Sequence, residues 1–162
     1  MSSMSVTAIR NTLSDFFTET FDSVQGIYLD RGTSLFETLD TISADVASRP
    51  VSATCATIAA QVEHIRYYLD VLEVYMTGGK PENVDWKHIW NTVSTVTPQE
   101  WEDSKIRLRA SYQRVTATLV SIADDTWNDD VPLPDALAII VHTAYHLGEI
   151  RQALCTVGDS TP

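Results

Sequence analysis

The feature that most constrains the fold is a run of apolar residues spaced three and four positions apart between residues 53 and 77. Its members are Ile58, Val62, Ile65, Leu69, Leu72 and Met76. They fall on one side of a helix because each residue turns the helix by about 100°. Gly78 and Gly79 follow directly and favour an end to the helix there. We therefore expect a long helix over about residues 53–77 with one face buried in a core.

Two further helical segments precede this one. The first covers about residues 6–23 and has its apolar positions at Leu13, Phe16, Phe17 and Phe21. A shorter helix follows Gly32, where Ser34 and Glu37 have the spacing of a capping box. The pattern leaves open whether the two segments form one kinked helix or two helices.

Two long helices are expected in the second half of the chain. Thr97, Pro98 and Glu100 are typical of a capped helix start, and the helix should end near Ile122. Its apolar positions are Ile106, Tyr112, Val115 and Leu119. The last helix should open around Pro134 and Asp135 and continue to about Cys155.

These helices predict an all-α fold, because no stretch shows the sustained alternation of a strand. The long connection over residues 80–96 favours a four-helix bundle with a crossover between the second and third main helices. A chain of 162 residues fits one domain, which we place at 1–156, followed by a short C-terminal tail at 157–162.

The charge of the chain narrows the choice of partners. With 22 acidic and 11 basic residues, the formal net charge is -11, which repels phosphate backbones and anionic lipid. We therefore expect neither a nucleic-acid partner nor a membrane. No apolar stretch has the length of a membrane span, and the N-terminal residues lack the pattern of a secretory signal. Two cysteines are too few for a disulfide scaffold, so a reducing cytoplasm is the expected location.

Three histidines form the candidate site. His142 and His146 lie four apart on the last helix, so their side chains project about 40° apart on one face. Glu149 lies close to the same face and is a candidate for contacting a ligand histidine or for acid–base work. Two histidines at this spacing also arise by chance, as ordinary core or surface residues. His64, in the middle of the 53–77 helix, makes a metal site between facing helices the stronger interpretation.

Such a site has three neutral nitrogen ligands and no fourth protein ligand that we can identify. Imidazole ligands suit Zn, Ni, Fe or Cu, and a missing fourth ligand is typical of catalytic sites. Tyr68 and Tyr75 share the His64 side of their helix and are candidate substrate-binding residues. His88, between Trp86 and Trp90, is interpreted as a loop residue.

Two familiar metal patterns are excluded. The segment His142-Thr-Ala-Tyr-His146 lacks the glutamate that serves as general base in HExxH metalloproteases. The di-iron bundles need Glu three residues before a histidine on two helices, and none of the three candidate ligands has it.

Other side chains have simpler interpretations. We expect the four tryptophans to pack connections on the bundle end, with a pocket floor or a dimer contact as the alternatives. Arg151 is interpreted as a structural ion-pair partner on the side away from the histidines. Cys55 and Cys155 are expected to be buried free thiols, too far from the site to be ligands.

The segments around these histidines resemble the DinB-like (DinB/YfiT) superfamily. The resemblance rests on Ala60-Gln-Val-Glu-His64-Ile-Arg-Tyr-Tyr-Leu69 together with His142-Thr-Ala-Tyr-His146-Leu-Gly-Glu-Ile-Arg151. It implies a four-helix bundle with a crossover, often a homodimer, and a three-histidine site for a divalent ion. Ni and Zn are the first candidates for the ion, and Fe, Mn or Cu the others.

The resemblance also implies a range of reactions on a small-molecule substrate. They include S-transfer from a low-molecular-weight thiol, thiol-dependent isomerisation and metal-dependent hydrolysis. A metal-dependent enzyme that activates a thiol or a water is therefore the leading hypothesis. The competing hypothesis is a non-catalytic bundle in which the metal has a structural or sensing role. A third is a core of hydrogen-bonded histidines without metal.

Overall fold

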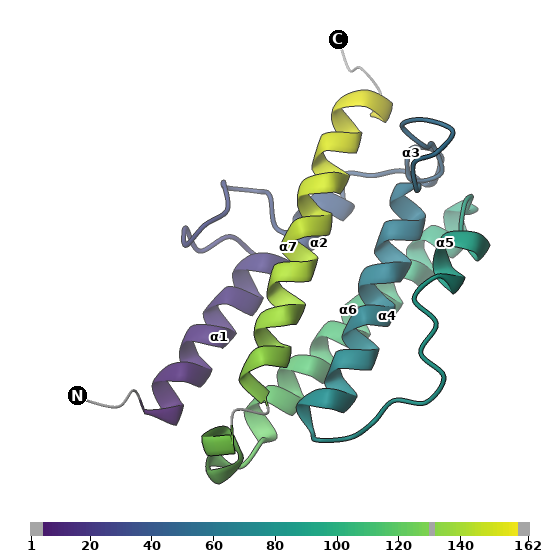
Figure 1. Ribbon diagram of the computed structural model, residues 1–162. Coiled ribbons are helices and arrows are strands. Elements are labelled where there is room, and N and C mark those ends of the chain that lie inside the picture. Colours follow the sequence, from purple (N-terminus) through teal and green to yellow (C-terminus); the bar gives the residue numbers. More distant parts are fainter. Residues whose placement is uncertain (1–4, 130–131, 159–162) are drawn as a thin grey trace.

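The computed structural model describes residues 5–129 and 132–158, and the elements in these ranges are helical (Figure 1). The four long helices are α1 (Val6–Phe21), α4 (Ile58–Met76), α6 (Pro98–Ser121) and α7 (Pro132–Val157). Short helices α2 (Leu35–Leu39), α3 (Ala44–Ala47) and α5 (His88–Thr92) and a 3₁₀ turn (Asp124–Asp129) lie in the connections. The all-α prediction is confirmed. Residues 159–162, most of the predicted tail, lie outside the described ranges.

The first helical region consists of two helices, which answers the question that the sequence left open. Between α1 and α2, residues 22–34 form a loop in which Gly26 and Gly32 have φ of 84° and 75°. These left-handed conformations favour glycine because it has no Cβ. The predicted capping box of α2 is confirmed, since the Glu37 carboxylate accepts from the backbone N–H of Ser34 at 3.1 Å.

A buried carboxylate holds this loop. Glu19 of α1 is fully buried and accepts backbone N–H groups from Gln25, Ile27, Tyr28 and Leu29, at distances between 2.6 and 3.0 Å. Burial alone would raise the pKa of Glu19, but the four N–H groups stabilise the charged form and lower it to about 2. The burial of Glu19 was not predicted from the pattern of the sequence.

Helix α4 begins at Ile58, so the predicted start near residue 53 is wrong. The Thr57 hydroxyl accepts from the backbone N–H of Ala60 at 3.2 Å and caps the helix. Just before it, the backbone N–H of Cys55 donates to the Ser52 carbonyl, which closes a turn. The apolar stripe also has its first member at Ile58, so the cap residue and the stripe agree on where the helix begins.

The core confirms the predicted stripe of α4, whose six members are all buried. In α6 one predicted core position is wrong: the Ile106 residue is 65% exposed. The buried positions of α6 are Trp101, Ser104, Leu108, Ser111, Val115 and Leu119. Ile106 lies two residues from Leu108, which places it about 200° around the helix and toward solvent.

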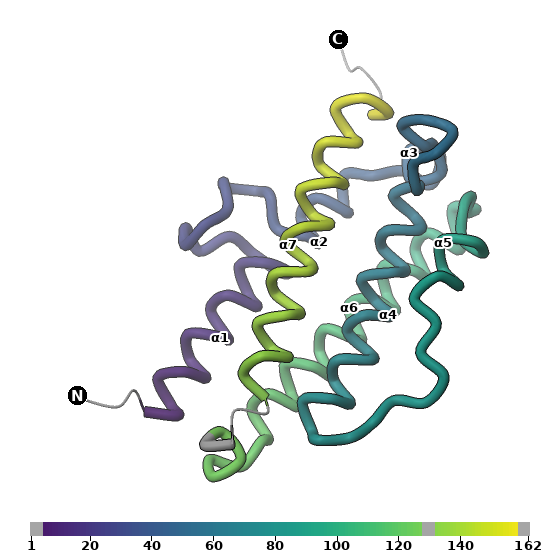
Figure 2. Tube along the Cα trace, viewed as in Figure 1, coloured from purple at the N-terminus to yellow at the C-terminus, as the bar shows by residue number. Residues whose placement is uncertain are grey.

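The predicted crossover determines how the long helices are arranged. The chain leaves the lower end of α4, passes along the outside through α5, and enters α6 at the upper end, so α4 and α6 run in the same direction (Figure 2). Helix α7 runs the opposite way beside α4 (Figure 1). Asp70 on α4 joins the two parallel helices, since it accepts from Arg114 and from the Ser111 hydroxyl of α6. Among the described helices, none is long and apolar enough to cross a membrane.

Candidate metal centre

The three predicted histidines meet where α4 and α7 lie side by side. His64 comes from the middle of α4, and His142 and His146 come from successive turns of α7. One nitrogen from each ring lies within 4.8 Å of the others, and the Nε2 atoms of His64 and His142 are 3.1 Å apart. The antiparallel pairing of α4 and α7 therefore assembles a site from residues 78 positions apart in sequence.

The surroundings keep these imidazoles neutral. His64 and His146 are each only 6% exposed. Burial, and the neighbouring His146, lower the pKa of His64 to about 4. Burial, and then the other two histidines, lower the pKa of His142 to about 3. Burial also lowers the pKa of His146, although the Glu149 carboxylate opposes that shift. Neutral nitrogens with free lone pairs are what a metal ion requires of histidine ligands.

The spacing of the rings fits a metal ion. Metal–nitrogen bonds of about 2.0–2.1 Å in a tetrahedral arrangement separate two ligand nitrogens by about 3.3 Å, close to the 3.1 Å between the Nε2 atoms of His64 and His142. A hydrogen bond can join those two nitrogens, but it does not account for the nearby ring of His146, whereas an ion would contact all three rings. Within the described ranges, the group that could hold an ion contains these three histidines and no fourth ligand.

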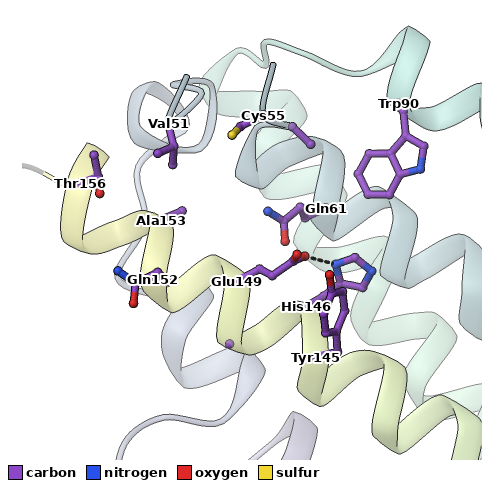
Figure 3. Close-up of a pocket in the computed structure, with 12 residues that line it drawn as sticks. Val51, Cys55, Gln61, Trp90, Tyr145, His146, Glu149, Gln152, Ala153 and Thr156 are labelled. Atoms are coloured by element: carbon purple, nitrogen blue, oxygen red, sulfur yellow. Dashed lines mark ion pairs between the residues drawn. The ribbon is translucent and has the colours of Figure 1, made fainter. Parts of the chain in front are cut away.

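Glu149 supports the site as the sequence suggested, by contacting a candidate ligand. Its Oε2 atom lies 2.9 Å from Nδ1 of His146, at ion-pair distance but outside good hydrogen-bond geometry (Figure 3). With Nδ1 facing this carboxylate, Nε2 is the nitrogen of His146 left to bind an ion. Glu149 also bonds to the hydroxyl of Tyr145, and this hydrogen bond raises the pKa of that tyrosine.

The two predicted substrate-binding tyrosines lie in different places. Tyr68 stacks on the ring of His142, with centroids 3.7 Å apart and planes 16° from parallel. It therefore fixes the orientation of one candidate ligand. Tyr75 is exposed and lies eleven residues beyond His64, about 16 Å along the helix axis. The structure does not bring Tyr75 to the histidines.

Two tryptophans from the crossover lie beside the ring of His64. The Trp90 ring is 4.4 Å from the His64 ring between centroids, and the Trp86 ring is 6.4 Å away. Of the three interpretations of the tryptophans, the pocket floor is the one that fits Trp90, because its side chain lines a cavity. Packing applies to Trp101, which is buried in α6 and donates its indole N–H to the Ile42 carbonyl at 2.7 Å.

A cavity of about 830 Å³ reaches the site beside His146. As Figure 3 shows, the cavity lies between the second half of α7 on one side and the first turns of α4 on the other. The segment 51–56, which precedes α4, also lines it. Its lining residues are Val51, Cys55, Ala56, Gln61, Trp90, Tyr145, His146, Gly148, Glu149, Gln152, Ala153 and Thr156. Sequence reasoning missed Gln61, although a glutamine three residues before His64 on the same helix face was a usable signal.

Three interpretations of other side chains need correction. Cys55 and Cys155 are both exposed rather than buried, because the segment 51–56 is a surface turn and Cys155 lies on the outer side of α7. His88 begins α5 instead of lying in a loop, where the Asp85 carboxylate accepts its backbone N–H at 3.2 Å. Arg151 donates to the Thr38 hydroxyl at 3.5 Å, so its contact is a hydrogen bond and not the expected ion pair.

Fold and site together define an all-α bundle with a buried cluster of three neutral histidines between two antiparallel helices. Comparison with known families agrees with this class. The family model described as DinB superfamily matches residues 29–150, most of the chain, including all three histidines. The chain belongs to the DinB superfamily. Neither the curated proteins nor the solved structures contain a match to it.

Proposed function

We propose that this chain is a metal-dependent enzyme in which His64, His142 and His146 hold one divalent ion, Ni or Zn before Fe, Mn or Cu. The observation that carries the proposal is the convergence of three neutral imidazole nitrogens within 4.8 Å. Membership of the DinB superfamily supports a metal at this position. Imidazole donors without a thiolate or a fourth ligand suit these ions and leave a coordination position for water or a thiol.

The reaction that we propose is activation of a thiol or a water for attack on a small electrophile. A bound divalent ion would lower the pKa of either nucleophile. Glu149 lines the cavity beside His146 and is placed to accept the proton that the nucleophile loses. Trp90 and Tyr68 pack against the rings of His64 and His142 and hold them in place.

The competing hypothesis of a structural or sensing metal predicts a different set of ligands around the ion. A structural ion is usually closed off by a fourth protein ligand. The three-member group in the described residues and the large cavity beside His146 favour an open site instead. An apolar-walled cavity with a few polar groups is typical of a small-molecule site.

The proposal also names the partners of the chain. We propose a small-molecule substrate, with no nucleic acid or membrane as partner, because the net charge is -11. We also propose a homodimer in the cytoplasm. Light scattering coupled to size exclusion tests the dimer, and a monomeric mass at micromolar concentration would exclude it.

Elemental analysis of protein purified without an affinity tag tests the metal and identifies it. We expect about one equivalent of a transition metal in the unmodified chain. His142→Ala should lose this metal while its circular dichroism stays helical, and His88→Ala should retain it, because His88 lies outside the cluster. A full equivalent of metal in His142→Ala would refute the proposed site.

A further inference from the structure

The cavity beside His146 contains a buried polar group without a partner. Gln61, near the start of α4, is only 8% exposed, and its buried Oε1 atom accepts no hydrogen bond from the residues that the structure describes. Figure 3 shows its carboxamide pointing into the cavity toward Glu149. A buried carbonyl oxygen without a donor is unfavourable. A ligand that brings an N–H group to this oxygen would therefore be bound selectively.

The second polar group in this part of the cavity is the Glu149 carboxylate. It is held beside His146 and accepts from Tyr145, and its remaining lone pairs are available to a second donor. Gln61 and Glu149 come from facing helices, so their two acceptors address the same space (Figure 3). Two acceptors in this arrangement suit a group that carries two N–H bonds.

Charge restricts the ligand further. Glu149 is an acid, and none of the described lining residues is a lysine or arginine. No cationic side chain is therefore present to pair with a carboxylate or phosphate on the ligand. A divalent ion at the three histidines would in turn oppose a cationic ligand. An uncharged ligand avoids the first penalty in the metal-free chain and the second where the proposed ion is bound.

The walls favour a flat apolar body. Trp90 and Tyr145, which are 38% and 61% exposed, both contact the ring of His146 and line the cavity beside it (Figure 3). Val51, Ala56 and Ala153 line the remainder. Aromatic and small apolar side chains bind aromatic or aliphatic ligands through buried area and offset stacking.

We propose that the cavity recognises a small uncharged primary amide, and that Gln61 is the residue that determines this specificity. The amide N–H groups would donate to Gln61 Oε1 and to Glu149, and the amide carbonyl would accept from Gln61 Nε2. The role of this amide as the substrate rests on the proposed function. The preference for an uncharged over a cationic ligand rests on it as well, whereas the hydrogen bonds of the amide to Gln61 and Glu149 need no metal.

The test uses three matched probes on the full-length, metal-free protein, with binding followed by NMR shifts of the Trp90 indole and Gln61 side-chain amide signals. Benzamide has both donors, N,N-dimethylbenzamide keeps the ring and carbonyl without donors, and benzoate replaces the amide with an anion. We expect benzamide to bind at least tenfold more tightly than either analogue. Equal affinities for the three, or no detectable binding of benzamide, would overturn the proposal.

Two variants assign the specificity to its residues. Gln61→Leu should reduce benzamide affinity to the level of the dimethyl analogue, whereas Gln113→Leu, at an exposed glutamine of α6, should leave it unchanged. Glu149→Gln, at a partly exposed position, removes the charge and should improve benzoate binding severalfold. Unchanged probe ranking in both Gln61→Leu and Glu149→Gln would refute the assignment. Because the protein carries no metal here, failure leaves the metal proposal standing, and loss of the metal proposal leaves this test valid.

Discussion

Metal binding at the three histidines should stabilise the folded chain by an amount that can be worked out in advance. The proposed ligands come from α4 and α7 and lie together only in the folded state. An ion should therefore bind the folded chain, because the unfolded chain has no assembled site. At a free ion concentration 100 times the dissociation constant, the gain in unfolding free energy is about 2.7 kcal/mol. For a domain of this size, that corresponds to a rise in melting temperature of about 5 to 10 °C.

Differential scanning calorimetry of the metal-free protein, with Zn²⁺ or Ni²⁺ added stepwise, measures this shift. The melting temperature should rise with the logarithm of free ion concentration once the site is saturated. His142→Ala should flatten this dependence, because two ligands remain, while His88→Ala should follow the unmodified chain. A shift of the same size in His142→Ala would show that the ion binds elsewhere, and no shift in the unmodified chain would refute the site.

Two further predictions concern charge. The metal-free protein should lose stability as the pH falls from 6.5 toward about 4. The folded-state pKa values of His64 and His142 lie below that of an unfolded histidine, so the unfolded chain binds more protons in this range. Urea unfolding at several pH values should show this slope, and an equally steep slope in His142→Ala would contradict it. Glu19→Gln should lower the melting temperature and speed hydrogen exchange at Ile27, Tyr28 and Leu29, because one amide oxygen replaces a carboxylate that accepts four N–H groups. Unchanged exchange at these amides would refute the role assigned to Glu19.

The helices and the pairing of His142 with His146 were predictable because they depend on local spacing. The α4 stripe, the caps at Ser34 and Thr97 and the four-residue interval of His142 and His146 each follow from helix geometry. The predicted start of α4 was wrong because Thr57 was not recognised as the cap that separates residues 53–56 from the helix.

Features that depend on tertiary contacts were out of reach of the sequence. Trp90 reaches His64 only because the crossover folds back over α4. The exposure of Cys55 depends on the turn before α4, and the burial of Glu19 depends on a loop from which four backbone N–H groups donate to its carboxylate. None of these features leaves a periodic trace in the sequence, since each depends on how the connections between the long helices fold back onto the bundle.

The position of the ligands along the chain has a consequence for the order of folding. His64 lies in the first half of the chain, and the other two histidines lie in the last helix, 78 and more residues later. During synthesis, α1 to α6 emerge before the site can exist, and only the docking of α7 against α4 completes it. At the proposed metal site, capture of an ion would therefore report the docking of α7. Contacts this distant in sequence also form slowly, so the rate at which the refolding chain took up Zn²⁺ at the proposed site would measure when α7 docks.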